Sequence, residues 1–141
     1  MCMRSDSSKD RNASAPLSTG GGRVLVIDDE PMMGTTLRMA LADQHDVVIL
    51  RSGTEAHRLL TDDHDFDAVV CDLMMPDVSG MELHAWLSDR APSLAQRMIF
   101  MTGGAYTDDA RRFLERVGNP HMQKPFDVKD LLDLVEELRR R

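Results

Sequence analysis

The sequence predicts an α/β fold, a doubly wound parallel β-sheet with helices on both faces, and two observations support this prediction. Short apolar runs recur along the chain, and each is followed by a segment whose apolar residues repeat at helical spacing. Five such strand–helix units follow one another, which is typical of a parallel sheet covered on both sides. Right-handed crossovers restrict a sheet of this kind to a few strand orders.

The first strand–helix unit begins after an N-terminal tail. Residues 1–22 are rich in Ser, Asn and Gly and lack apolar periodicity, so we expect a disordered tail or linker before one domain over residues 23–141. Val24–Ile27 is a β-branched-rich run typical of a buried strand. Pro31 suits the first position of the following helix. The apolar positions of this helix fall on one face, at Met33, Leu37, Ala40 and Leu41.

Four further apolar runs continue the pattern as strands, each followed by a helix with one apolar face. The runs are Val47–Leu50, Ala68–Cys71, Met98–Met101 and Pro120–Gln123. Two of the helices begin with the pattern of a capping box, in which a Ser and a Glu three residues later cap each other's backbone N–H. These pairs are Ser52 with Glu55 and Ser79 with Glu82. The inward positions are Ala56, Leu59 and Leu60; Leu83, Trp86 and Leu87; Ala110, Phe113, Leu114 and Val117; and Val128, Leu131, Leu132, Val135 and Leu138.

Composition excludes several classes of function. The chain has 24 acidic and 17 basic residues, a net charge of −7, and a nucleic-acid partner would require a basic face. No apolar run approaches the roughly 20 residues that cross a bilayer. We therefore expect a cytoplasmic protein with neither a nucleic-acid nor a membrane partner. Two cysteines, Cys2 and Cys71, do not form a disulfide framework, and Cys71 is expected to be buried in its strand.

Polar side chains follow four of the five predicted strands at their carboxyl ends, the edge where open α/β sheets bind ligands. Asp28 and Asp29 follow the first strand, Asp72 the third, Thr102 the fourth and Lys124 the fifth. Two like charges 4 Å apart repel by about 4 kcal/mol at an effective dielectric near 20, so three converging carboxylates need a cation. Oxygen-only ligands favour Mg²⁺. A carboxylate beside a cation, an ammonium and a hydroxyl is suited to accept a phosphoryl group.

Four motifs of this sequence resemble those of response-regulator receiver domains. They are Val26-Ile27-Asp28-Asp29-Glu30-Pro31, Asp72-Leu73-Met74-Met75-Pro76-Asp77 with Gly80, Met101-Thr102-Gly103-Gly104, and Lys124-Pro125-Phe126. The resemblance covers about residues 23 to 140, in the family's order and spacing. It implies a flavodoxin-like, CheY-like (βα)5 domain whose five strands lie in the order 2-1-3-4-5.

The resemblance also implies a role for each motif residue. Asp72 is implied to be the phosphoacceptor. The implied ligands of Mg²⁺, for which Mn²⁺ is expected to substitute, are Asp28, Asp29, an oxygen of Asp72 and the main-chain carbonyl of Met74. Thr102 is implied to donate a hydrogen bond to the bound phosphoryl group and to shift toward it on activation, and Lys124 is implied to pair with a phosphoryl oxygen. The peptide bond before Pro125 is implied to be cis, and the small Gly103 is implied to keep access to the site open.

Three positions depart from the family pattern. His121 stands three residues before Lys124, where receivers carry a Tyr or Phe that moves with the Thr. The aromatic readout of the switch is therefore in question. Met74 and Gly104 occupy the positions that could orient an attacking water, and neither carries a suitable group. We therefore expect slow self-dephosphorylation.

The implied function is a two-component phosphorelay receiver, a signalling domain and not an enzyme. Its phosphodonor would be a sensor histidine kinase or a histidine phosphotransfer protein, and its downstream protein target is not identified by the sequence. The chain stops soon after the last helix at Arg141, so we expect no output domain and signalling through protein contacts. Met-Thr-Gly-Gly-Ala and Asn119-Pro120 are also similar to receivers of hybrid sensor kinases, from which this chain could be a module.

Other interpretations stay open at this point. A Mg²⁺-dependent aspartyl-phosphate phosphatase or phosphotransferase is the runner-up. Haloacid-dehalogenase-like enzymes, however, need Asp-x-Asp where this chain has Asp28-Asp29-Glu30. A degenerate receiver acting as a scaffold is a third interpretation, and Asp28-Asp29 alone would suit a helix cap. The remaining histidines lack metal-ligand spacing and are expected at the surface; they are His45, His57, His64 and His84.

Overall fold

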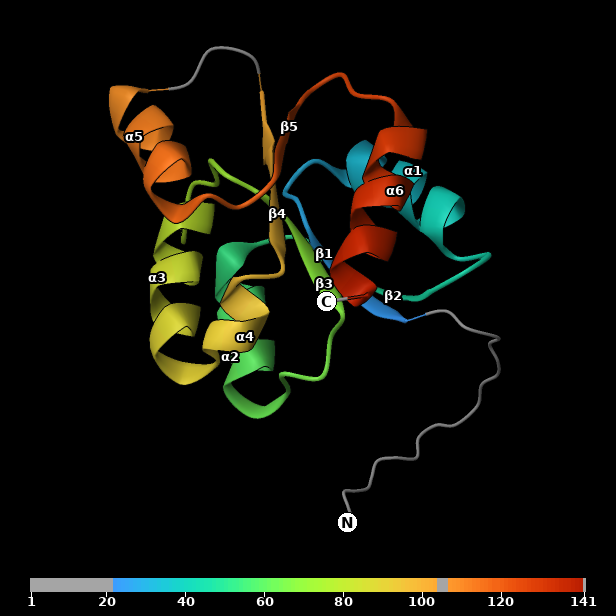
Figure 1. Cartoon of the computed structure of the whole chain (residues 1–141), viewed down its shortest axis with the longest axis horizontal. Coiled ribbons are helices and arrows are strands. Elements are labelled where there is room, and N and C mark those ends of the chain that lie inside the picture. The colour runs from blue at the N-terminus through green and yellow to red at the C-terminus, as the bar shows by residue number, and fades with distance from the viewer. Residues whose placement is uncertain (1–21, 104–106, 141) are drawn as a thin grey trace.

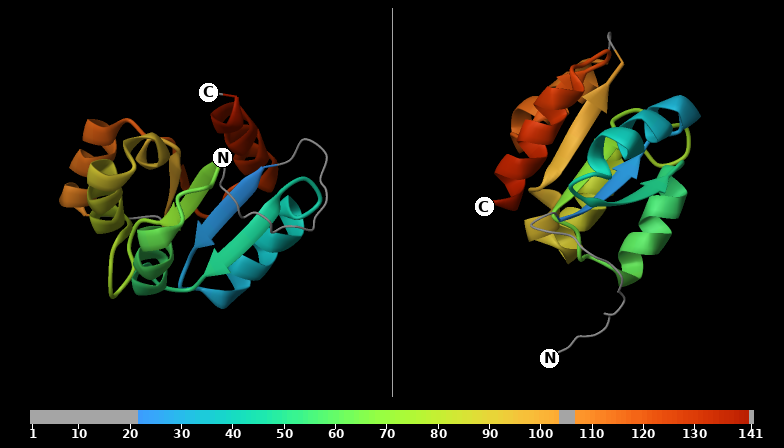
Figure 2. Two further views of the ribbon diagram at one scale, coloured as in Figure 1. Left: turned by 90° about the horizontal axis from the view of Figure 1, so that it is seen from below. Right: turned by 90° about the vertical axis from the view of Figure 1, so that its right-hand side faces the viewer.

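The computed structural model describes residues 22–103 and 107–140, and the strands in this part of the chain form one parallel sheet (Figures 1 and 2). The strand order is β2-β1-β3-β4-β5, as predicted. The strands are β1 (Arg23–Ile27), β2 (Asp46–Leu50), β3 (Ala68–Asp72), β4 (Met98–Thr102) and β5 (His121–Gln123). Apart from Gly22, the predicted tail lies outside the described residues.

Helices cover both faces of the sheet, so the domain has three layers (Figure 1). One face carries α1 (Pro31–Leu41) and α6 (Val128–Arg139). The other carries α2 (Gly53–Asp62), α3 (Gly80–Arg90), the short α4 (Pro92–Ala95) and α5 (Asp108–Val117). The apolar core is divided accordingly into two clusters, one on each side of the sheet. The short helix α4, a single turn that begins at Pro92, was not predicted from the sequence.

The apolar runs form strands because both faces of the sheet exclude water. Every residue of β3 and β4 is buried, and β1 is buried from Val24 to Ile27. Central parallel strands therefore read as continuous hydrophobic segments instead of alternating ones. The edge strands β2 and β5 are less buried. Full burial of each Val, Leu or Ile contributes about 1.5–3 kcal/mol, so the three central strands anchor the fold.

The helix starts follow the predicted capping residues with one exception. The box at α3 is complete, with Ser79 Oγ accepting from Glu82 N–H and the Glu82 carboxylate accepting from Ser79 N–H. At α2, Ser52 Oγ accepts from Glu55 N–H, but the Glu55 carboxylate accepts from Arg51 N–H. The predicted box at α2 is therefore only half formed, because the Glu side chain reaches one residue further back.

The prediction of surface exposure is wrong for two of the four histidines. His45 is buried: its Nδ1 accepts from Gly22 N–H, and its Nε2 lies 3.7 Å from Glu136 on α6. His84 is half-buried, with its ring edge-on to Phe113 at 5.3 Å between ring centroids. Both are covered by helices distant in sequence, which local periodicity does not reveal. His57 and His64 are exposed, as predicted.

Cys71 is buried in β3, as predicted, and burial raises the pKa of its thiol.

None of the described helices combines the length and the apolar character needed to cross a membrane.

Candidate functional site

The parallel pairing of β1 with β3 brings the acidic residues together at the carboxyl edge of the sheet. Ile27 is paired with Cys71, so Asp28, directly after β1, and Asp72, the last residue of β3, lie at the same level of neighbouring strands. Carboxylate oxygens of Asp28, Asp29 and Asp72 lie within 4.8 Å of one another. Asp28 and Asp72 are buried, whereas Asp29 is exposed. The predicted convergence of the three carboxylates is confirmed.

Backbone N–H groups of the loops fix the orientation of two of these carboxylates. Asp28 Oδ1 accepts from Glu30 N–H at 2.8 Å, at the start of α1. Asp72 Oδ1 accepts from Met74 N–H at 3.3 Å, in the loop that follows β3. The other oxygen of each carboxylate, Oδ2, faces Lys124 Nζ.

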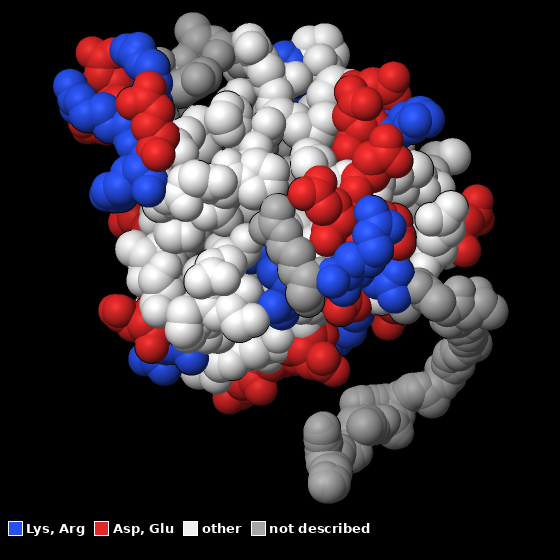
Figure 3. Space-filling model, viewed as in Figure 1, with Lys and Arg blue, Asp and Glu red and all other residues white. Residues whose placement is uncertain are grey.

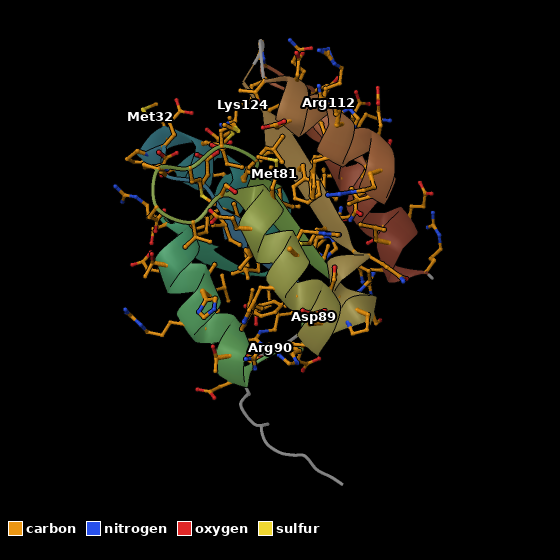
Figure 4. All side chains as sticks on the ribbon, turned by 90° about the vertical axis from the view of Figure 1, so that its left-hand side faces the viewer. Met32, Met81, Asp89, Arg90, Arg112 and Lys124 are labelled. Carbon is orange, nitrogen blue, oxygen red and sulfur yellow. The ribbon has the colours of Figure 1, made fainter. Side chains whose placement is uncertain are left out.

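Lys124 lies beside these acids, at the end of the molecule opposite Asp89 and Arg90 (Figure 4). Its Nζ donates to Asp28 Oδ2 at 2.9 Å and to Asp72 Oδ2 at 3.5 Å. Its backbone N–H donates to the Thr102 carbonyl at 2.7 Å, which continues the pairing of β5 with β4. The Lys124–Pro125 peptide bond is cis, as the resemblance implied.

The pKa directions of Asp72 and Lys124 reflect this crowding. Burial raises the pKa of Asp72; Lys124 opposes that effect, while the charges of Asp28 and Asp29 add to it. For Lys124, burial lowers the pKa, but the hydrogen bond to Asp28 and the charges of Asp72, Asp28 and Glu30 outweigh it, so the net direction is upward. The lysine is held as a cation in a site that still carries an excess of negative charge.

The other predicted site residues lie near the ends of β3 and β4 and, in the case of His121, at the start of β5. Thr102 is buried, and its hydroxyl donates to the Met122 carbonyl of β5 at 3.4 Å, so it is turned toward β5. Gly103 and His121 are exposed. Met74 follows Asp72 by two residues and is 46% exposed. Gly104 lies outside the described residues.

The donor set fits a hard divalent cation. Three carboxylates face one ammonium, which leaves the cluster with net negative charge. All the side-chain donors are oxygens, which Mg²⁺ prefers and zinc or copper does not. Asp28, Asp29 and Asp72 are the side chains that could hold the ion.

Two residues near this site have contacts that the sequence analysis did not anticipate. Glu30 Oε1 lies 3.6 Å from Lys124 Nζ and adds a fourth carboxylate at the mouth of the site. Asp77 accepts from the N–H groups of Gly53 and Thr54 and so joins the loop after β3 to α2. Glu30 directly follows Asp28-Asp29, so its place in the sequence could have indicated that it belongs to the acidic cluster. The partners of Asp77 lie more than twenty residues away, and no local pattern indicates them.

Known proteins share both the sequence pattern and this fold. The transcriptional regulatory protein TcrA of Mycobacterium tuberculosis is 32% identical over 122 residues, covering 86% of this chain and 47% of TcrA. The uncharacterized transcriptional regulatory protein YrkP of Bacillus subtilis is 31% identical over 122 residues, covering 84% of this chain and 50% of YrkP. The chain spans about half the length of the curated relatives it matches.

Solved receiver structures superpose on most of the chain. A response regulator receiver domain protein from Clostridium thermocellum is 28% identical with a TM-score of 0.75, covering 84% of this chain and 94% of that one. A CheY-like receiver from Methanospirillum hungatei, at 22% identity and a TM-score of 0.76, shares the fold over 85% of this chain and 94% of its own. The family model described as response regulator receiver domain matches residues 24–136. The chain belongs to the receiver-domain family of two-component response regulators.

Proposed function

We propose that Asp72 accepts a phosphoryl group from the phosphohistidine of a sensor histidine kinase or a histidine phosphotransfer protein. The observation that carries this proposal is the arrangement around Asp72. This single carboxylate lies next to Asp28 and Asp29 on one side and 3.5 Å from Lys124 Nζ on the other. Asp28 has similar neighbours, but its side chain is fully buried, whereas the side chain of Asp72 is 11% exposed and can be reached by a phosphodonor.

The metal in this proposal is Mg²⁺, for which Mn²⁺ would substitute. Asp28, Asp29, Asp72 and the main-chain carbonyl of Met74 would hold it. A bound divalent cation supplies positive charge that neutralises phosphoryl oxygens during transfer. Because the carboxylates already crowd one another, cation binding would also relieve their mutual repulsion.

The transfer step involves one bond broken and one bond formed. A carboxylate oxygen of Asp72 attacks the phosphorus in line, a phosphorus–oxygen bond forms, and the phosphorus–nitrogen bond to the donor imidazole breaks. The bonding electron pair stays on the imidazole nitrogen. Lys124, already held as a cation, would offset the charge that spreads over the phosphoryl oxygens. The product is an aspartyl phosphate.

Thr102 would change its partner after transfer. Its hydrogen bond to the Met122 carbonyl is 3.4 Å long, well beyond the usual 2.7–2.8 Å of hydroxyl donors, so little stabilisation is lost when it breaks. The phosphoryl group adds about −1.5 to −2 charges and offers strong acceptor oxygens to the hydroxyl. Met122 and His121 are neighbours on β5, so a shift of Thr102 would reach the exposed His121 at the sheet edge.

The domain would act as an acceptor and not as a turnover enzyme. The thioether of Met74 carries no group that could orient an attacking water, which supports a long-lived phosphorylated form. The phosphorylated form would act in the cytoplasm through contacts with a protein target. Charges of both signs gather over α5, where Asp108 and Asp109 pair with Arg111 and Arg112, and a mixed surface of this kind does not favour nucleic acid (Figure 3).

Labelling with acetyl phosphate or beryllofluoride in the presence of MgCl₂ tests this function. The wild type is expected to take up one equivalent and Asp72→Asn none. Asp89→Asn, at the far end of α3, is the matched control and should label normally (Figure 4). Labelling that survives in Asp72→Asn would overturn the assignment. Release of many equivalents of phosphate per chain would favour a phosphatase instead.

A further inference from the structure

The loop between β3 and α3, residues 73–79, is attached to the start of α2 by one side chain. Asp77 Oδ2 accepts from Thr54 N–H at 2.8 Å, and Asp77 Oδ1 accepts from Gly53 N–H at 3.4 Å. Hydrogen bonds from the Thr54 side chain and backbone hold the pKa of Asp77 well below its usual range. The carboxylate therefore stays ionised, at a helix N-terminus that favours negative charge.

Close backbone packing accompanies this attachment. A Cβ placed on Gly53 would lie 2.1 Å from the Val78 carbonyl oxygen and 2.6 Å from the Val78 Cβ. No side chain larger than that of Gly fits at such distances, so the start of α2 is in direct contact with the loop. The close approach of Gly53 to Val78 brings the Gly53 N–H within reach of the Asp77 carboxylate.

The other anchors of the loop lie at its two ends and in its middle. Leu73 is buried, its N–H donates to the Met101 carbonyl, and its carbonyl accepts from Gly80 N–H, each at 2.9 Å. Met75 is buried as well. Met74 lies between these residues, exposed, and its N–H bonds to Asp72. The outer half of the loop, residues 76–78, is held at Asp77.

We propose that Asp77 is a positioning residue of the phosphoacceptor site. By fixing the loop to α2, it would orient the Met74 carbonyl toward the cation and the Met74 N–H toward Asp72. Asp77 itself would touch neither the cation nor the phosphoryl group. This inference rests on the proposed function, because it assumes that the site binds Mg²⁺.

The test compares Mg²⁺ affinity, measured by titration calorimetry on the full chain, among four proteins: wild type, Asp77→Ala, Asp77→Asn and Ser52→Ala. Ser52→Ala is the matched control because it removes the other cap of α2, the bond to Glu55 N–H, and leaves the loop attachment intact. Asp77→Ala is expected to weaken Mg²⁺ binding about tenfold, the lower end for groups that orient metal ligands. Asp77→Asn keeps one acceptor oxygen and should lie in between, and Ser52→Ala should bind like the wild type.

A second measurement does not depend on the cation. Hydrogen exchange of the Met74 amide should accelerate in metal-free Asp77→Ala and stay unchanged in Ser52→Ala. Equal effects of Asp77→Ala and Ser52→Ala on both measurements would overturn the inference, since the loss would then come from α2 alone. A wild type that binds no Mg²⁺ would refute the proposed function and this inference together.

Discussion

Replacing Lys124 with Met tests the electrostatic account of the site most directly. The substitution keeps the apolar stem of the side chain and removes its charge. Lys124 Nζ lies 2.9 Å from Asp28 Oδ2 and 3.5 Å from Asp72 Oδ2, and the three side chains are only 17%, 0% and 11% exposed. The variant therefore leaves buried carboxylates without their cation.

The distances set the size of the expected effect. At an effective dielectric near 20, each of the two attractions is worth about 5 kcal/mol before desolvation is subtracted. Removal of one partner from a buried ion pair typically costs about 3–5 kcal/mol. Asp29 and Glu30 are exposed, so water reaches the edge of this site, and we expect the free energy of unfolding to fall by about 2–3 kcal/mol in the absence of divalent cations.

Urea denaturation in EDTA and in saturating MgCl₂ measures this effect. Lys129→Met is the matched control, because Lys129 pairs with Asp133 at 3.5 Å while both side chains are more than two-thirds exposed. The control should change stability by less than about 0.5 kcal/mol. Mg²⁺ should stabilise Lys124→Met more than the wild type, since the ion restores the missing positive charge. Equal losses in the two variants, or an equal Mg²⁺ response in Lys124→Met and wild type, would refute the reasoning.

Three further predictions concern Asp72, His45 and Gly80. Burial raises the pKa of Asp72 above its ordinary 3.8, so stability falls as the pH rises from 3.8 through the folded-state pKa. Without divalent cations, Asp72→Asn should therefore be more stable than the wild type in urea denaturation at neutral pH, and lower stability would contradict this. Burial lowers the pKa of His45 below 6.5, an effect that Arg139 reinforces and Glu136 and Asp67 oppose. The contribution of His45 to stability is therefore present above pH 6.5 and is lost as the pH falls through the folded-state pKa. His45→Gln should lose less stability on acidification in denaturation curves, and an unchanged dependence of stability on pH would contradict this. A Cβ on Gly80 would lie 2.8 Å from the Asp72 carbonyl oxygen, so Gly80→Ala should lower stability by about 1–3 kcal/mol in thermal denaturation. Gly103→Ala, whose Cβ would have no described atom within 4 Å, should be nearly neutral, and equal effects of the two substitutions would argue against the close contact.

Local patterns predicted the strands and helices because apolar runs, helical periodicity and capping pairs are each visible within a short stretch of sequence. The continuous apolar run of β4 is a strand buried on both faces, and Ser79 with Glu82 does cap α3. Chemistry at strand ends could also be predicted, since parallel strands bring their carboxyl ends to one edge. Asp28, Asp72 and Lys124 meet there. The sheet order itself came from the family resemblance, because apolar runs alone do not say which strands are neighbours.

Contacts between segments that are distant in the chain could not be predicted from the sequence. His45 is buried because α6, some ninety residues later, packs over it. The Thr102 hydroxyl is turned to Met122 because β5 is placed beside β4. Neither contact leaves a periodic signal, since each depends on how two elements pack in three dimensions.

The sequence by itself determined which residue types stand at the ends of the strands, and with them the acidic, magnesium-suited chemistry of the site. Only the tertiary structure decided how these groups are held: Lys124 against Asp28, and the loop after β3 against α2 through Asp77. The physical reason is range. Hydrophobic periodicity and capping pairs are visible within a few residues of the chain, whereas the distances that set charge–charge energies and fix loops are created when remote segments pack together.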